Sequence, residues 1–381
     1  MKLMRNSIYI HFFVLLMLFT SCGQKQQQPV VTPWGEIADT IPADDNFDLD
    51  DIQRNGELIA FTITGPDTYY DYRGRHLGTQ YLLAQRFADK LGVSLRMEVC
   101  RDTAEMRARL SDGEADLVCY PMSPEAPGWL VGDDKAELAE ELHKWYKPSM
   151  LAEVKKQEAY LLSSNSVQRH VFSPMLNRSA GIISHYDSFF QQFAPQIHWD
   201  WRLLAAQCYQ ESCFDPQARS WAGACGLMQI MPSTADHLGL PRNQIFDPGQ
   251  NIAAAVKYLA ELNSSFADVR NSTERIKFVL AAYNGGGYHI RDAMALARKH
   301  GRNELLWRNV EPFVLGLQRP EYYNDPVVKN GYMRGSETVD YVRRIHDRWN
   351  GYRGVHTVRS VAGPMGIPQK AKRERKQKYQ I

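Results

Sequence analysis

Residues 200–212 read Asp-Trp-Arg-Leu-Leu-Ala-Ala-Gln-Cys-Tyr-Gln-Glu-Ser, and this stretch indicates a helix with one apolar stripe. Asp200 suits the N-cap because its carboxylate can accept hydrogen bonds from the free N–H groups of the first turn. Trp201, Leu204 and Cys208 follow at helical spacing, and Glu211 continues the stripe three residues later. A carboxyl group there is partly desolvated, so we expect its pKa to be raised. Such a group can deliver a proton near neutral pH.

The sequence on both sides of this stretch keeps a helical period. Helices are predicted over residues 186–193, 199–212, 251–264, 273–283 and 290–299. We therefore predict a mainly α-helical domain over residues 181–354. Taken alone, Glu211 fits an ordinary ion pair near a helix end as well as it fits a catalytic acid.

Three further segments combine small residues with side chains that suit a sugar. Residues 218–232 contain Gly-Leu-Met-Gln-Ile-Met-Pro, residues 281–287 read Ala-Ala-Tyr-Asn-Gly-Gly-Gly, and residues 335–342 read Gly-Ser-Glu-Thr-Val-Asp-Tyr-Val. Small residues let the backbone approach a sugar, while methionine and glutamine offer an apolar face and an amide. The glycine run is not a phosphate loop, because no Lys-Ser/Thr follows it and no strand precedes it.

Together with Gln210-Glu211-Ser212, these segments resemble, in order, the motifs of the goose-type lysozyme and lytic transglycosylase family. The resemblance runs from about Ile183 to about Arg348 and implies a lysozyme-like fold for the helical domain. It implies that Glu211 is the catalytic acid in the cleavage of peptidoglycan glycan strands. It further implies roles in substrate binding for Ser212, Ser220, Gly226, Met228, Gln229, Tyr283, Asn284, Glu337 and Tyr341, among which Tyr341 would orient the acid.

Glycosidases that use two carboxylates need a second one across the sugar ring. The motifs offer no obvious candidate, since Asp215 lies beside Pro216 in a turn. A single acid fits substrate assistance, in which the N-acetyl group or the C6 hydroxyl of the muramic residue attacks the anomeric carbon. Attack by the C6 hydroxyl would leave a 1,6-anhydro end at the cut β-1,4 bond. Two alternatives stay open: a lysozyme-like muramidase that uses water, and a catalytically inactive wall-binding lipoprotein.

Upstream of the helical domain, short apolar runs alternate with helical segments. Strands are expected over residues 58–63, 94–100 and 115–120, with helices over 81–91 and 105–110. This alternation indicates an α/β module with a parallel sheet, which we place at residues 53–165. A polar linker is predicted at residues 166–180.

The α/β module resembles the first lobe of periplasmic solute-binding proteins, through Asn55-Gly56-Glu57-Leu58, Phe87-Ala88-Asp89-Lys90-Leu91-Gly92-Val93 and Asp112-Gly113-Glu114-Ala115-Asp116-Leu117. Residues 121–127 lead almost directly into a returning strand at 128–131 and a helix at 135–146, so the second lobe is missing. A single lobe has no clamshell in which to close on a ligand. We therefore expect the aromatic loop at Tyr69–Arg73 to pack on the sheet or on the helical domain, with a wall-binding or regulatory role as the alternative. A module of this kind joined to the helical domain resembles membrane-bound lytic murein transglycosylases of the F type.

The first 22 residues have the features of a lipoprotein signal peptide: Lys2 and Arg5, an apolar stretch from Ile8 to Phe19, and small residues before Cys22. Cys22 is then the lipidated residue, and an uncleaved anchor is the alternative. Residues 23–52 are rich in Gln, Pro and Asp and are predicted to be a flexible tether. The basic residues 355–381 are predicted to be a disordered tail.

Composition limits the other possibilities. A net charge of +2 over 381 residues gives no reason to expect a nucleic-acid partner. The chain has no His-Glu-x-x-His segment and no Cys-x-x-Cys pair, so neither a metal nor another cofactor is predicted. The five cysteines after Cys22 are expected to be buried free thiols. The predicted partners are peptidoglycan strands and, through the lipid, a membrane, with a monomer at the periplasmic face of the outer membrane.

Overall fold

The computed structural model describes residues 47–122, 127–163, 166–168, 177 and 180–353. The predicted signal peptide with Cys22, most of the predicted tether and the basic tail lie outside these residues. From Asp48 onward the described chain belongs to one compact unit. Over the same part of the chain, no helix is long and apolar enough to cross a membrane.

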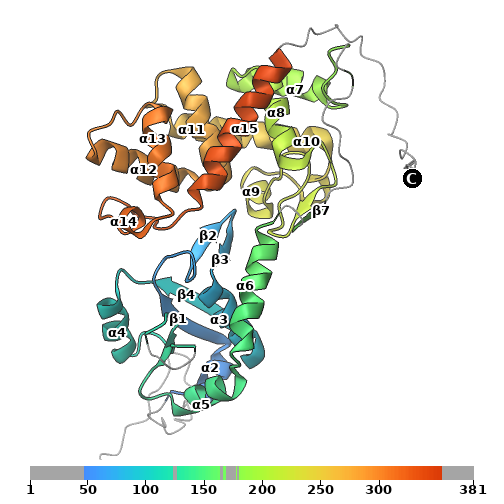
Figure 1. Ribbon diagram of the computed structural model, residues 1–381. Helices are drawn as coiled ribbons and strands as arrows, with labels where there is room; N and C mark the ends of the chain where they lie inside the picture. The colour runs from blue at the N-terminus through green and yellow to red at the C-terminus, as the bar shows by residue number, and fades with distance from the viewer. Residues whose placement is uncertain (1–46, 123–126, 164–165, 169–176, 178–179, 354–381) are drawn as a thin grey trace, which may run out of the picture. The chain divides into compact units, whose positions relative to one another are not determined.

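The α/β module contains a four-stranded sheet with the order β4-β1-β5-β6 (Figure 1). The central strand β1 (Glu57–Thr62) pairs in parallel with β4 (Ser94–Val99) and with β5 (Leu117–Val118). The strand β6 (Leu130–Val131) runs antiparallel to β5. Residues 119–129 alone separate β5 from β6, so the predicted single lobe is confirmed. The expected parallel sheet holds for three of the four strands.

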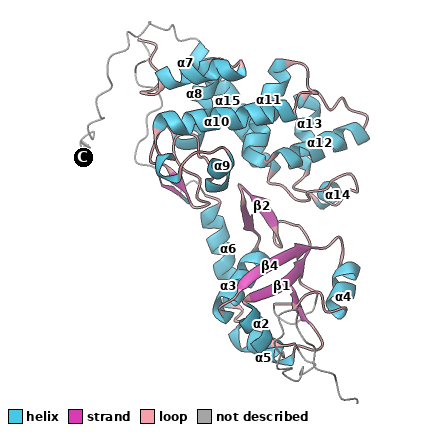
Figure 2. Cartoon of the chain, turned by 180° about the vertical axis from the view of Figure 1, so that it is seen from behind, coloured by secondary structure: helices cyan, strands magenta, loops and turns pink. Residues whose placement is uncertain are grey.

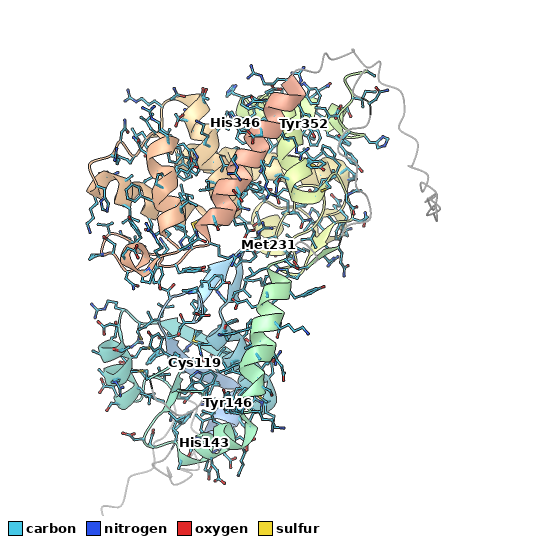
Figure 3. The ribbon with its side chains drawn as sticks, viewed as in Figure 1. Cys119, His143, Tyr146, Met231, His346 and Tyr352 are labelled. Carbon is cyan, nitrogen blue, oxygen red and sulfur yellow. The ribbon has the colours of Figure 1, made fainter. Side chains whose placement is uncertain are left out.

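The helices of this module are α2 (Leu49–Asn55), α3 (Thr79–Leu91), α4 (Thr103–Ser111), α5 (Ala136–Trp145) and α6 (Ser149–Leu161). Buried apolar side chains from α2, α3 and α5 pack against β1 and β5, together with Cys119, which Figure 3 labels.

The start of the module corrects one boundary. The prediction that the tether continues to residue 52 is wrong, because α2 begins at Leu49. Asp48 caps α2 in a capping box with Asp51. The same carboxylate accepts the backbone N–H groups of Glu137 (2.8 Å) and Leu138 (3.1 Å) in the first turn of α5. One buried side chain thus satisfies donors of two helices, which the composition of the segment does not reveal.

A short hairpin projects from the module between β1 and α3. Its strands are β2 (Tyr70–Tyr72) and β3 (Arg75–Leu77), joined through Arg73 and Gly74, both with positive φ (50° and 72°). Two successive residues of positive φ suit a tight hairpin turn. Glu158 of α6, which is buried, holds the base of the hairpin by accepting the Tyr70 hydroxyl at 2.8 Å and the Gly78 N–H at 3.1 Å.

The helical domain confirms the predicted fold class (Figure 2). Five helices match the predicted ones to within three residues: α7 (Asp187–Phe193), α8 (Trp201–Ser212), α10 (Pro248–Ser265), α11 (Ser272–Gly285) and α12 (Gly287–Lys299). Four were not predicted as helices: α9 (Pro232–His237), α13 (Trp307–Gly316), α14 (Pro320–Tyr323) and α15 (Gly335–Arg353). Figure 3 labels His346 and Tyr352 on α15, the helix that packs along α8.

The segment predicted as a linker is not irregular throughout. The strand β7 (Val167–Gln168) pairs antiparallel with β8 (Arg219–Ser220) of the helical domain. Val167 lies opposite Ser220 in this register. The linker therefore adds backbone hydrogen bonds next to one of the predicted site residues.

Candidate functional site

Glu211 lies in the last turn of α8 and is 9% exposed. The Asp200 side chain caps this helix by accepting the N–H of Arg202, as predicted. The helix is buried on more than one stripe, since every residue from Leu203 to Tyr209 is buried. It ends sharply, because Cys213 and Phe214 both have positive φ (56° and 64°). Glu211 is thus held at the rigid end of a core helix.

Tyr341 of α15 orients the Glu211 carboxyl. Its hydroxyl donates to Oε1 of Glu211 at 2.5 Å and receives the Nε2 amide of Gln207 at 3.3 Å. Burial raises the pKa of Tyr341 well above its ordinary value, and the charge of Glu211 raises it further. The phenol therefore keeps its proton and acts as a donor to Glu211. Gln207 lies one helical turn before Glu211 and was not identified from the sequence.

Two cavities share the Glu211 carboxyl as part of their walls. The aromatic cavity, of about 660 Å³, is lined by Tyr69, Tyr70, Tyr258, Tyr283 and Tyr288 among others. The arginine cavity, of about 400 Å³, is lined by Arg73, Arg334 and Arg344 among others. Gln229, Asn284 and Arg73 line both cavities as Glu211 does. A chain-like ligand that occupies both would pass Glu211.

Six of the predicted binding residues line these cavities. Gln229 and Asn284 line both, Tyr283 lines the aromatic cavity, and the arginine cavity includes Ser220, Glu337 and Tyr341. Hydrogen bonds to other groups of the protein hold three of these side chains in place. The Gln229 amide donates to the carbonyl of Gly226 at 2.9 Å, the Asn284 carbonyl oxygen accepts from Thr338 at 2.8 Å, and the Tyr283 hydroxyl donates to the carbonyl of Met228 at 2.8 Å.

The other three predicted binding residues, Ser212, Gly226 and Met228, line neither cavity. Ser212 and Met228 are fully buried, which leaves no surface for a sugar. Gly226 has φ +78°, and a Cβ there would come within 2.6 Å of the Asn251 amide. In this structure these three residues lie behind the cavity walls, and their predicted role in substrate binding stays a prediction. Motif membership alone does not separate wall residues from supporting ones.

The β2–β3 hairpin of the α/β module contacts the same site. Arg73 donates to Oε1 of Glu337 at 2.6 Å, and the Tyr72 hydroxyl donates to the same oxygen at 2.8 Å. The Tyr72 ring stacks on Trp221, with 6.2 Å between ring centroids. The Arg75 guanidinium donates to the carbonyl of Ala222 at 3.0 Å. The aromatic loop therefore packs on the helical domain, one of the two arrangements expected from the sequence.

The other carboxyl groups on the cavity walls are all paired. Asp71 pairs with His76 at 2.7 Å, Glu337 with Arg73 at 2.6 Å, and Asp340 with Arg343 at 2.6 Å. Hydrogen bonding to His76 lowers the pKa of Asp71. A basic side chain therefore contacts each of these three carboxylates.

Neither metal ligands nor thiols mark this site. Within the described ranges, no group of three or more His, Cys, Asp or Glu residues could hold a metal ion. The five described cysteines are buried and free, as predicted. Cys208 lies on α8 behind Glu211, and burial raises its pKa well above the ordinary value. A reactive thiolate is therefore not part of the site.

A family model matches part of the helical domain, and two curated relatives match larger parts of the chain. Residues 188–306 match the transglycosylase SLT domain. A membrane-bound lytic murein transglycosylase F of Desulfosudis oleivorans is 32% identical over 236 residues, which are 60% of this chain and 50% of that protein. A protein of the same name from an Enterobacter species is 28% identical over 77% of this chain and 78% of that protein. The chain thus spans about half the length of the first relative.

Solved structures match each part separately. The 70-kDa soluble lytic transglycosylase of Escherichia coli is 25% identical over 44% of this chain and 24% of its own, with a TM-score of 0.31. The arginine-bound form of domain 1 from TmArgBP is 19% identical over 27% of this chain and 98% of its own, with a TM-score of 0.23.

Proposed function

We propose that this chain, which carries a transglycosylase SLT domain at residues 188–306, is a peptidoglycan lytic transglycosylase. Its reaction is the cleavage of the β-1,4 bond between N-acetylmuramic acid and N-acetylglucosamine, with formation of a 1,6-anhydro end. The observation that carries the proposal is a single buried acid, Glu211, that lines two adjoining cavities and accepts the Tyr341 hydroxyl.

Glu211 serves as acid and then as base in this proposal. The Glu211 carboxyl, which accepts the Tyr341 hydroxyl at Oε1, carries the proton to be transferred. This proton passes to the glycosidic oxygen as the bond to the anomeric carbon breaks. The C6 hydroxyl of the same muramic residue then attacks that carbon, and its proton returns to Glu211. Atoms balance without water, because the hydroxyl is part of the substrate.

The pairing of the other wall carboxylates favours this route over hydrolysis. An inverting hydrolase needs a second carboxylate that can accept a proton from water, and a retaining one needs a carboxylate nucleophile. Asp71, Glu337 and Asp340 are each bound to a basic side chain. A carboxylate oxygen that already accepts a basic donor is less available to take a proton from water or to attack the anomeric carbon.

Product mass tests the reaction. Purified peptidoglycan is incubated with the chain lacking residues 1–22 and with its Glu211→Gln variant, and the released muropeptides are weighed. We expect anhydro-muropeptides, each lighter by one water than the hydrolysed product, from the unaltered protein alone. Hydrated products would identify a muramidase, and no products would leave a wall-binding protein.

We further propose that the protein acts in the cell envelope as a lipid-anchored monomer. The support is the basic start, the apolar stretch and the small residues before Cys22. The absence of an acidic residue directly after Cys22 favours the outer membrane. Incorporation of a labelled fatty acid into the unaltered protein but not into the Cys22→Ala variant, followed by membrane separation, tests both points.

A further inference from the structure

The arginine cavity carries an excess of positive charge while Glu211 is protonated. Three arginines line it, and its carboxyl groups are Glu211, Glu337 and Asp340. Asp340 is neutralised by Arg343, which lies outside the wall. When Glu211 is protonated for catalysis, Glu337 is the one carboxylate left to balance Arg73, Arg334 and Arg344.

Glu337 is bound by two of these arginines. Arg73 lies 2.6 Å from Oε1, and Nε of Arg334 lies 3.6 Å from Oε2. The guanidinium of Arg344 forms no ion pair or hydrogen bond with the part of the chain that the structure describes. It is exposed, and it lies on α15 one helical turn beyond Tyr341. Three residues of helix correspond to about 4.5 Å along the axis.

We propose that Arg344 binds a carboxylate carried by the muramic acid substituent of the substrate. A guanidinium pairs with a carboxylate through two parallel hydrogen bonds, which gives the contact both strength and direction. The sugars themselves are uncharged, so the carboxylates of a peptidoglycan strand lie on the lactyl group or on the peptide attached to it. This inference rests on the proposed function and adds a residue that selects the substrate.

The aromatic cavity has more aromatic side chains than the arginine cavity, and its basic residues are Arg73, Lys329 and His289. Its walls contain five tyrosines, which suit the apolar faces of sugar rings. The two sides of Glu211 therefore present different chemistry to the strand. We assign the charged substituent to the arginine cavity and the unsubstituted sugar faces to the aromatic cavity.

Binding of defined fragments to the catalytically inactive protein tests the proposal. The full-length protein with Glu211→Gln is titrated with a disaccharide-peptide that has free carboxylates and with the same compound amidated. A second pair of ligands is the peptide-free disaccharide with a free lactyl carboxylate and its amide. If the free carboxylate form of one pair binds more tightly than its amide, the carboxylate that differs within that pair is the one bound by Arg344. We expect the free acid to bind roughly ten times more tightly than its amide, because a charge-assisted contact of about 1.4 kcal/mol corresponds to a tenfold ratio between their Kd values.

Arg344→Ala in this background should reduce that ratio to about one, and Arg344→Lys should keep part of it. The matched control is Arg308→Ala, an exposed arginine on α13 that lines neither cavity, which should leave the ratio unchanged. Thermal unfolding of each variant shows whether it folds, and Arg344→Lys serves if the alanine variant does not. An unchanged ratio in both folded Arg344 variants would overturn the proposal while leaving the transglycosylase reaction intact. Failure to bind any fragment, together with no muropeptide release by the unaltered protein, would instead overturn the proposed function.

Discussion

The hydroxyl of Tyr341 can be removed without changing the shape of its ring, and Tyr341→Phe therefore isolates one contact of Glu211, the proposed catalytic acid. That hydroxyl donates to Glu211 at 2.5 Å in a buried setting. A donor stabilises a carboxylate in its charged form. Hydrogen bonds to charged groups contribute about 1.5–3 kcal/mol. Since one pH unit corresponds to about 1.36 kcal/mol, loss of the donor should shift ionisation of Glu211 upward by roughly one to two pH units.

The sign follows from the role of the acid. Cleavage requires protonated Glu211, so activity falls on the alkaline side as this group ionises. In Tyr341→Phe the charged form is less stable, and the alkaline limb of the kcat/KM profile should move to higher pH. The maximum value of kcat/KM should fall at the same time, because the Glu211 carboxyl loses the contact that orients it.

The assay is muropeptide release measured across a pH series. Tyr352→Phe is the matched control, since Tyr352 is also buried on α15 but lines neither cavity. Its alkaline limb should coincide with that of the unaltered protein. If the limb of Tyr341→Phe coincides with it as well, Tyr341 does not stabilise the charged acid, and the reasoning is refuted.

Three further predictions concern the scaffold around the acid. Gly226→Ala should lower stability by more than about 1 kcal/mol in chemical unfolding, because its Cβ would come within 2.6 Å of Asn251, whereas Gly301→Ala has a similar φ of +67° but open space and should cost less. A smaller loss for Gly226→Ala than for Gly301→Ala would contradict this. Burial lowers the pKa of His289, so the native state binds fewer protons than the unfolded chain, and stability should fall as the pH drops below about 6.5. His289→Gln should flatten that dependence in thermal melts, and an unchanged slope would count against it. Cys208 is fully buried with a raised pKa and should react with iodoacetamide in unfolded protein only, so peptide mapping that finds it modified in the native protein would contradict the packing.

The sequence predicted those parts of the site that depend on local pattern. The stripe on residues 200–212 located Glu211 on a buried helix, because burial of a helix face follows from the spacing of its apolar residues. The role of Tyr341 came from resemblance, and the structure places its hydroxyl 2.5 Å from Glu211. The same resemblance did not distinguish Met228, which is fully buried, from Gln229, its neighbour on the cavity wall. That difference depends on the direction in which the turn points each side chain. The turn includes a positive φ of 49° at Gln229, which the pattern of residue types does not predict.

Contacts between segments far apart in the sequence could not be predicted. The contact between Arg73 and Glu337 joins residues 264 positions apart, and periodicity carries no information at that range. The helix α6 was not predicted for a related reason. Leu151 and Val154 begin an apolar stripe, but Glu158 takes the next core-facing position. Its charge is acceptable there because Tyr70, Gly78 and Thr79 donate to it, and all three come from another part of the chain.

The geometry of Glu337 bears on why one acid would suffice. Its Oε1 accepts both the Tyr72 hydroxyl and the Arg73 guanidinium, so a proton on that oxygen would displace two donors. Activation of water by Glu337 would require it to take up that proton, at the cost of a charge-assisted contact. The C6 hydroxyl of a bound muramic residue needs no such activation by a second group, because Glu211 is already a carboxylate after giving up its proton. In the proposed reaction the hairpin therefore leaves Glu211 as the group that accepts the C6 hydroxyl proton, because Oε1 of Glu337 is already occupied by two donors.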